Sequence, residues 1–166
     1  ELLQQEVQKA YQQGQTNYPP ADGTPELKQA VSKLYHRSFG LDYGAEGVCV
    51  ASGARPPLYS TWRLFVAPGE RSISFLPAWN VGYYAHISQA RHEFIPTTAE
   101  NNFHPTVAQV EQALPNTQLI VLNSPLNPTG TVIDKENLRG IAQAIVDENK
   151  KRNHKRPVML LFDQVY

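Results

Sequence analysis

Residues 119–162 have the sequence LIVLNSPLNPTGTVIDKENLRGIAQAIVDENKKRNHKRPVMLLF, in which two short apolar runs enclose one amphipathic segment. The runs at residues 119–122 and 158–162 have the length and composition of buried β-strands. Between them, apolar side chains recur at helical spacing, which predicts a helix over residues 134–149. Because strands that are apolar on both sides cannot face water, this pattern predicts a parallel sheet covered by helices on both faces.

The same alternation continues toward the N-terminus. Apolar runs predict further strands at residues 48–51, 73–76 and 93–95. Helical spacing and helix-start residues predict helices at residues 1–13, 24–39, 56–66, 81–88 and 106–114. We therefore expect an α/β fold of three layers, a mostly parallel sheet with flanking helices, preceded by an N-terminal helical arm. The predicted domains are residues 1–40, an arm and interface segment, and residues 41–166, which contain the sheet.

The composition excludes several classes of protein. The 166 residues are 41% hydrophobic, and 15 basic side chains balance 15 acidic ones, so neither disorder nor polyanion binding is indicated. The basic run at residues 150–156 is interpreted as a solvated loop. No apolar run approaches the length of a membrane span, about 20 residues, and residues 1–13 lack the layout of a signal peptide. We expect no nucleic-acid or membrane partner.

Thiol and imidazole groups give no site. Cys49 is the sole cysteine and lies in an apolar run, so it is interpreted as a small buried side chain rather than half of a disulfide. A reduced thiol fits a cytoplasmic location. No metal site is predicted, because no metal-ligand spacing is formed by the histidines, which are His36, His86, His92, His104 and His154.

Ligands of an open α/β sheet bind beyond the carboxyl ends of its strands, where two segments stand out early in the chain. After residues 48–51, the turn Ser-Gly-Ala-Arg offers the amides of Gly53, Ala54 and Arg55 to an anion such as phosphate, although small-residue turns before helices are common. After residues 73–76 comes Trp79, with two tyrosines close behind. These aromatic side chains fit either core packing or stacking on a planar ligand.

Two later strand ends carry stronger signals. Residues 123–130, NSPLNPTG, hold Asn127 directly before a proline, which biases it to extended geometry and fixes its amide. The run at residues 158–162 is followed by Asp163, whose carboxylate is costly there unless a cation or several donors meet it. In a regular strand Asp163 and Tyr166 would point to opposite faces, about 10 Å apart, so joint use requires the chain to bend.

Together these segments resemble the fold type I, pyridoxal phosphate-dependent aminotransferases of classes I and II. The resemblance covers nearly the whole chain: Tyr18, Gly23 and Leu27 before a helix, then SGA at residues 52–54, PAWN at 77–80, NSPLNPTG at 123–130 and DQVY at 163–166. Asn-Pro-Thr-Gly and Asp-x-x-Tyr are its most specific parts. It implies a transaminase that acts on amino acids and 2-oxo acids, with pyridoxal 5'-phosphate held by the large domain to which residues 41–166 belong.

The resemblance also assigns residues to the cofactor ring. Trp79 would stack on the pyridine, and Asn127 and Tyr166 would hydrogen-bond the ring hydroxyl. Asp163 would pair with the ring nitrogen and keep it protonated, so that the ring can act as an electron sink. Asp163 and Tyr166 are thus the predicted catalytic residues. The family's usual Asp-Glu-x-Tyr is Asp-Gln-Val-Tyr in this chain, a departure at a position without direct cofactor contact.

The phosphate group would be held by residues of the first third of the chain. By the same resemblance, the amides of Gly53 and Ala54, with Arg55, would bind it. Tyr18 is similar to the family's tyrosine that reaches the phosphate of the neighbouring subunit, which implies a homodimer. Two prolines after Arg55 are an unusual continuation of the phosphate turn.

The family's Schiff-base lysine has no counterpart in this sequence. In relatives it lies beyond the Asp-x-x-Tyr motif, and none of the seven lysines of this chain falls at a predicted strand end. We therefore interpret the chain as the N-terminal portion of an aminotransferase, truncated after Tyr166 and inactive alone.

Two other functions are compatible with parts of the pattern. The chain could be a non-catalytic module that binds pyridoxal phosphate or another phosphorylated ligand in a regulatory or scaffolding role. A Rossmann-like nucleotide binder is disfavoured, because no G-x-G-x-x-G follows a strand. The amino acid substrate is open, and lyase and decarboxylase chemistries share the same cofactor contacts.

Overall fold

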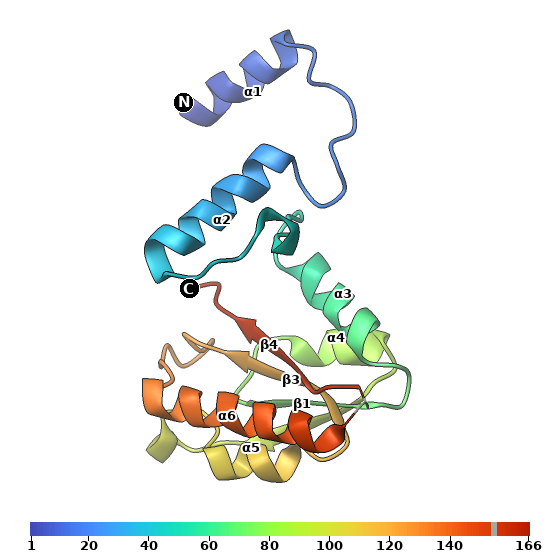
Figure 1. The fold of residues 1–166 in the computed structure, drawn as a ribbon, viewed down its shortest axis with the longest axis vertical. Coiled ribbons are helices and arrows are strands. Elements are labelled where there is room, and N and C mark those ends of the chain that lie inside the picture. Colours follow the sequence, from blue (N-terminus) through green and yellow to red (C-terminus); the bar gives the residue numbers. More distant parts are fainter. Residues whose placement is uncertain (154–155) are drawn as a thin grey trace. The chain divides into compact units, whose positions relative to one another are not determined.

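The chain forms two compact units in the computed structural model, which describes residues 1–153 and 156–166 (Figure 1). The first unit is Glu1–Pro56 and the second is Pro57–Tyr166. The first therefore holds all of the predicted arm together with residues 41–56.

The first unit is helical. Helix α1 spans Leu2–Gln12, α2 spans Pro25–Phe39, and a short 3-10 turn, η1, spans Ala45–Gly47. Helix α2 begins as predicted: the Thr24 hydroxyl accepts a hydrogen bond from the backbone N–H of Leu27 at 3.3 Å, and proline occupies the first helical position. It ends at Gly40, whose φ of 66° is the left-handed conformation that glycine adopts without strain.

The strand predicted at residues 48–51 is wrong, since no strand is assigned in the described first unit. An apolar run becomes a strand only where another strand pairs with it, whereas Val50 donates one backbone hydrogen bond, to Asp22 at 2.9 Å. Gly23 lets the chain approach this closely, because a Cβ there would lie 2.8 Å from the Cβ of Val50. The buried position expected for Cys49 is also wrong, because its side chain is exposed.

The second unit is built on a parallel sheet. Its strands in the described residues are β1 (Arg71–Leu76), β2 (Arg91–Pro96), β3 (Thr117–Asn123) and β4 (Met159–Asp163), in the order β2-β1-β3-β4. Its helices there are α3 (Arg55–Phe65), whose first two residues belong to the first unit, α4 (Val81–Ile87), α5 (Val107–Ala113) and α6 (Lys135–Arg152). A 3-10 turn, η2, spans Ala99–Asn101. Each strand and α-helix of this unit matches a predicted one to within a few residues, whereas η2 was not predicted.

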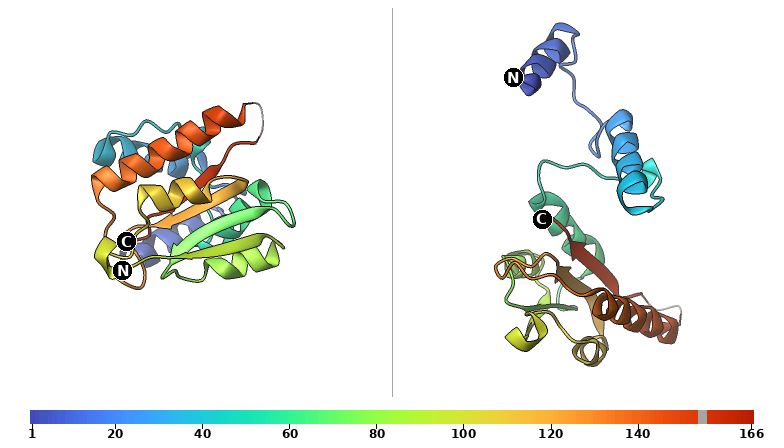
Figure 2. Two further views of the ribbon diagram at one scale, coloured as in Figure 1. Left: turned by 90° about the horizontal axis from the view of Figure 1, so that it is seen from below. Right: turned by 90° about the vertical axis from the view of Figure 1, so that its left-hand side faces the viewer.

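The helices cover both faces of the sheet, with α5 and α6 on one side and α4 on the other (Figure 2). Against α5 and α6 the core is formed by alternate residues of the two central strands, including Ile73 and Ile120. Against α3 and α4 it is formed by the other set, including Leu119, which packs with Trp62. The predicted three-layer α/β fold is confirmed.

The basic run at residues 150–156 is partly structured. Its first three residues complete α6, and Arg152 forms an ion pair with Glu148 at 3.1 Å. Arg156 forms an ion pair with Glu70 at 2.9 Å, while His154 and Lys155 lie outside the described residues. The loop interpretation is therefore wrong for residues 150–152. Within the described ranges, no helix is both long and apolar enough to cross a membrane.

Candidate active site

The sheet topology brings three predicted site segments to one edge. The chain runs from β1 through α4 to its neighbour β2, then through α5 past β1 to β3, so the direction of winding reverses between β1 and β3. Ligands of open α/β sheets bind at the carboxyl ends of the strands beside such a reversal. Trp79 follows the end of β1, Asn127 follows β3, and Asp163 ends β4.

Asn127 and Tyr166 are in direct contact. The side-chain N–H of Asn127 donates to the Tyr166 hydroxyl at 3.0 Å, across a separation of 39 residues. The alternation of side chains along a strand does not apply to Tyr166, because β4 ends at Asp163 and residues 164–166 are not part of the strand. The bend that joint use of Asp163 and Tyr166 would require at the end of the strand stays a prediction.

Asp163 is a half-buried carboxyl group. Burial raises its pKa, and a hydrogen bond from the backbone N–H of Val165 opposes this rise. In the described part of the chain, no ion pair to Asp163 is formed. A carboxylate that is desolvated and unpaired suits a cationic N–H ligand, which would stabilise its charged form. The group therefore fits the ring nitrogen of pyridoxal phosphate.

The loop after β3 is closed by its own backbone and held by a neighbouring loop. The N–H of Gly130 donates to the Leu126 carbonyl at 2.7 Å, and the N–H of Leu126 donates to the Thr131 carbonyl at 2.8 Å. The Thr131 hydroxyl donates to the Asn102 carbonyl at 2.7 Å and lies 3.4 Å from Nε2 of the buried His104. Burial lowers the pKa of His104, against the opposing effects of Thr131 and Asp134.

These supporting residues were not predicted. Thr131 lies just outside the recognised motif and has no distinctive local pattern. The sequence singles out His104 only as a candidate metal ligand, and it lacks the spacing of one. Asn123 supports the same loop, because its side-chain oxygen accepts from the backbone N–H of Asn127 at 2.8 Å. It lies inside the motif, and its position at a strand end was the available signal.

The aromatic residues beyond β1 divide between the two roles that the sequence left open. Tyr84 is buried and its ring centroid lies 5.7 Å from that of Trp62, so it belongs to the core. Tyr83 and Trp79 are exposed. Trp79 is thus accessible to a planar ligand, and its stacking role stays a prediction.

The remaining predicted site residues belong to the first unit. Tyr18 is fully exposed. Gly53 has a φ of 92°, which disfavours any other residue, and its N–H donates to the Ala51 carbonyl at 2.9 Å. Ala54 and Arg55 follow it, and Arg55 is the first residue of α3. A common site that joins this group to Asn127, Asp163 and Tyr166 is a proposal.

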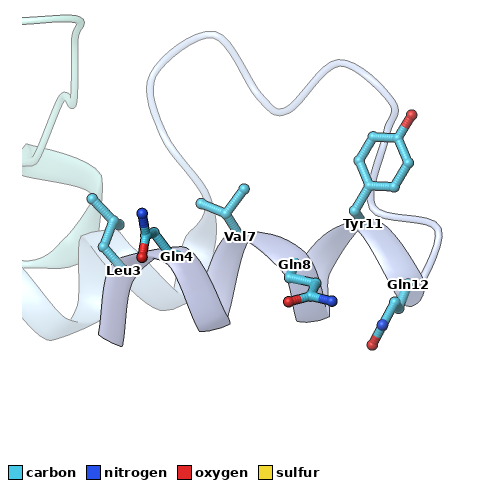
Figure 3. A pocket seen from close by; sticks show the side chains of 6 residues that line it. All are labelled: Leu3, Gln4, Val7, Gln8, Tyr11 and Gln12. Carbon is cyan, nitrogen blue, oxygen red and sulfur yellow. The ribbon is translucent and has the colours of Figure 1, made fainter. Parts of the chain in front are cut away.

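A separate hollow of about 640 Å³ lies along α1 (Figure 3). It is lined by Leu3, Gln4, Val7, Gln8, Tyr11 and Gln12, which form one side of a single helix. No charged residue lines it, so it offers no ionic partner to a phosphate or to a ring cation. None of the predicted site residues contributes to it.

The whole chain, residues 1–166, matches the family model described as aminotransferase class I and II. It is 35% identical over 150 residues to an aspartate aminotransferase of Pyrococcus horikoshii, covering 89% of this chain and 38% of the relative. It is 33% identical to an asparagine–oxo-acid transaminase of Streptococcus mutans, covering 99% of this chain and 40% of that protein. The chain thus spans about two fifths of the length of the relatives that it matches.

Solved structures give the same result. The aspartate aminotransferase from Thermus thermophilus with maleate superimposes with a TM-score of 0.88 at 29% identity, over 98% of this chain and 41% of the other. The aspartate aminotransferase from Rhizobium meliloti gives a TM-score of 0.86 at 30% identity, over 96% and 39%.

Proposed function

The chain belongs to the class I and II aminotransferases, and on this premise we propose that the full-length protein transfers an amino group between an amino acid and a 2-oxo acid. The cofactor of this family is pyridoxal phosphate, which supplies an electron sink when bound. The names of the relatives make aspartate the first amino acid to test. No observation favours the alternative of a non-catalytic binding module.

The observation that carries this proposal is the state of Asp163. Its carboxyl group is half-buried at the end of β4, a partly exposed strand at the edge of the sheet, and its pKa is raised by burial. The Asn127–Tyr166 pair lies in the segments that follow β3 and β4. A cationic ring nitrogen would relieve the burial of charge, and Asp163 would in return hold the proton on that nitrogen. Asn127 and Tyr166 would orient the ring through its hydroxyl.

The other residues would bind the cofactor without taking part in proton transfer. Trp79 would stack on the ring face. The N–H groups before α3, from Gly53, Ala54 and Arg55, would receive the phosphate, because a helix N-terminus presents donors to an anion. A phosphate would have to compete with the Ala51 carbonyl for the N–H of Gly53.

The quaternary structure and location form a second part of the proposal. The full exposure of the Tyr18 side chain supports a contact with the phosphate of a neighbouring subunit in a homodimer. Residues 1–40 would then serve as the interface arm, and residues 41–166 as part of the cofactor-binding domain. An exposed single thiol, Cys49, supports a reducing location, the cytoplasm.

The test is a steady-state assay of the full-length protein with pyridoxal phosphate, aspartate and 2-oxoglutarate. We expect transamination in the wild type and, in Asp163→Asn, a fall in kcat by a factor of about 10² to 10³ with a much smaller change in KM. The matched control is Asp147→Asn on α6, which replaces a half-exposed aspartate paired with Lys150 and should leave kcat unchanged.

Two results would contradict the proposal. Absence of transamination with any of a panel of amino acids would contradict the function. A near-normal kcat in Asp163→Asn would instead show that Asp163 closes the strand without contacting the cofactor. Circular dichroism of each variant checks that it has folded.

A further inference from the structure

The side chain of Asn123 joins the two strand ends that carry the predicted ring contacts. Asn123 is the last residue of β3 and is paired in register with Asp163, the last residue of β4. Its side-chain N–H donates to the Asp163 carbonyl at 3.1 Å, and its side-chain oxygen accepts from the backbone N–H of Asn127 at 2.8 Å. One amide therefore holds both Asp163 and Asn127.

The orientation of this amide is determined by its partners. A backbone carbonyl can only accept and a backbone N–H can only donate, so the nitrogen of Asn123 must face Asp163 and its oxygen must face Asn127. The planar amide fixes the separation of its donor and acceptor. It thereby limits how far the end of β4 and the loop after β3 can move relative to one another.

The contact extends to the other predicted ring residue. The side chain of Asn127, whose backbone is bound to Asn123, donates to the Tyr166 hydroxyl at 3.0 Å. The Asp163 carbonyl also accepts from the backbone N–H of Ser124 at 3.2 Å, so it is held at the end of β3 by two donors. Asn123 is thus bound to both sides of the predicted ring site and is assigned no cofactor contact.

We propose that Asn123 is a positioning residue, whose amide sets the carboxylate of Asp163 and the side chain of Asn127 at the spacing that one cofactor ring requires. The inference rests on the function proposed above. Without the amide, Asp163 would still face the ring nitrogen and Asn127 the ring hydroxyl, but the two contacts would no longer be fixed to each other. Groups held at the correct geometry before binding lose less free energy when the ligand arrives.

The chain contains a matched control for this proposal. Asn149 on α6 donates through its side-chain N–H to the Val158 carbonyl at 3.0 Å and accepts from the Val158 backbone N–H at 2.7 Å. Its amide therefore makes the same two kinds of bond at the opposite end of β4, which begins at Met159. Asn149→Ala removes hydrogen bonds of the same chemistry and touches no predicted cofactor contact.

The experiment compares Asn123→Ala, Asn123→Asp and Asn149→Ala in the full-length protein. Without cofactor, hydrogen exchange at the Asn127 backbone amide should accelerate in Asn123→Ala and stay unchanged in Asn149→Ala. With pyridoxal phosphate labelled with ¹⁵N in its ring, Asn123→Ala should shift the nitrogen resonance toward the unprotonated form. Its cofactor dissociation constant should rise about 10-fold, which corresponds to the loss of about one hydrogen bond.

Asn123→Asp distinguishes the bond to the Asp163 carbonyl from the bond to the Asn127 N–H. It also replaces Asn123→Ala in the experiment if the alanine variant fails to fold. It keeps an acceptor for the Asn127 N–H but places an oxygen against the Asp163 carbonyl, so the Asn127 amide should stay protected while the ring-nitrogen resonance still shifts. If the Asn123 variants match Asn149→Ala in affinity and in the ring-nitrogen resonance, Asn123 is only structural. If the wild type still binds the cofactor and transaminates, that result refutes only the role of Asn123. A wild type that binds no cofactor overturns the proposed function together with this inference.

Discussion

The half-buried histidine of β2, His92, should make the second unit lose stability as the pH falls. His92 lies with Nδ1 2.8 Å from the Ser72 hydroxyl and Nε2 2.9 Å from the Ser74 hydroxyl, and its ring packs edge-on against Phe94 at 4.6 Å. Burial lowers its pKa from 6.5 to about 4. Ser72 also accepts from the Trp62 ring N–H at 3.3 Å, which occupies part of its capacity to accept from a protonated ring.

The direction and size of the effect come from this displacement of the pKa. In the unfolded chain His92 takes up a proton near pH 6.5, whereas in the folded chain it does so only near pH 4. The stability contributed by the neutral ring is therefore complete above pH 6.5 and is lost as the pH falls toward 4. At about 1.4 kcal/mol per pKa unit the full difference is about 3 kcal/mol, and screening of a partly exposed ring reduces it to about 2 kcal/mol.

The assay is urea unfolding of the 166-residue chain at several pH values, followed by tryptophan fluorescence. Both tryptophans, Trp62 and Trp79, lie in the second unit, so the signal reports that unit. In His92→Gln the side chain can still donate to one serine and accept from the other but cannot titrate. Between pH 7 and pH 4 the wild type should lose about 2 kcal/mol more than this variant.

The control is His86→Gln, which removes an exposed histidine from the same unit. This variant should follow the wild type over the whole pH range. Parallel curves for the wild type and His92→Gln would refute the reasoning, because they would show that the His92 ring takes up its proton at the same pH in both states.

Three further predictions concern packing and cofactor binding. Gly140→Ala should destabilise the chain in urea by up to about 2 kcal/mol, because its Cβ would lie 2.6 Å from Cγ2 of Val107 and overpacking of about 1 to 3 kcal/mol outweighs the gain in helix propensity of about 1 kcal/mol. Val107→Ala should relieve this loss of stability, and an unchanged urea midpoint in Gly140→Ala would contradict the prediction. In the full-length protein Tyr18→Phe should weaken retention of pyridoxal phosphate by about 1.5 to 3 kcal/mol in equilibrium dialysis, and unchanged retention would remove Tyr18 from the site. Borohydride reduction of the 166-residue chain mixed with pyridoxal phosphate should label no single lysine, and one stoichiometric adduct would overturn the view that the chain lacks the Schiff-base residue.

The second unit was predictable because its pattern is simple. Strands β3 and β4 are continuous apolar runs, and α6 has a regular apolar face, so their positions follow from the sequence. Helix α6 continues to Arg152, three residues beyond the predicted end. Its last turn is held by the ion pair of Arg152 with Glu148 and by a hydrogen bond from Arg152 to the Leu114 carbonyl, a contact that local sequence does not reveal.

Residues 48–51 show where this reasoning fails. The run around Cys49 is apolar, but a strand is defined by its partner, and the described first unit supplies none. The apolar character of residues 48–51 predicted a strand, but a strand forms only where a second strand pairs with it. Burial of the thiol was inferred from the same run and failed with it.

The sequence predicted which residues belong to the candidate site but not which of them contact one another. The motifs identified Asn127, Asp163 and Tyr166, but strand alternation alone would have placed the last two on opposite faces. Their use together depends on the end of β4 at Asp163. The role of Asn123 depends further on the register that pairs it with Asp163, which is a property of the assembled sheet.

His92 and Asp163 show how burial distinguishes a structural group from a functional one. Burial favours the neutral form of each, yet a neutral histidine is satisfied at neutral pH by two serine hydroxyls. The raised pKa of Asp163 has the opposite consequence: the stability that its protonated form contributes is lost as the pH rises through that pKa, so the folded chain bears a cost at neutral pH. No side chain described in this structure offsets that cost with an opposite charge. A group that destabilises the free protein at neutral pH and would be stabilised by a cationic ligand is what a binding site requires, which is why Asp163 and not His92 marks the candidate site.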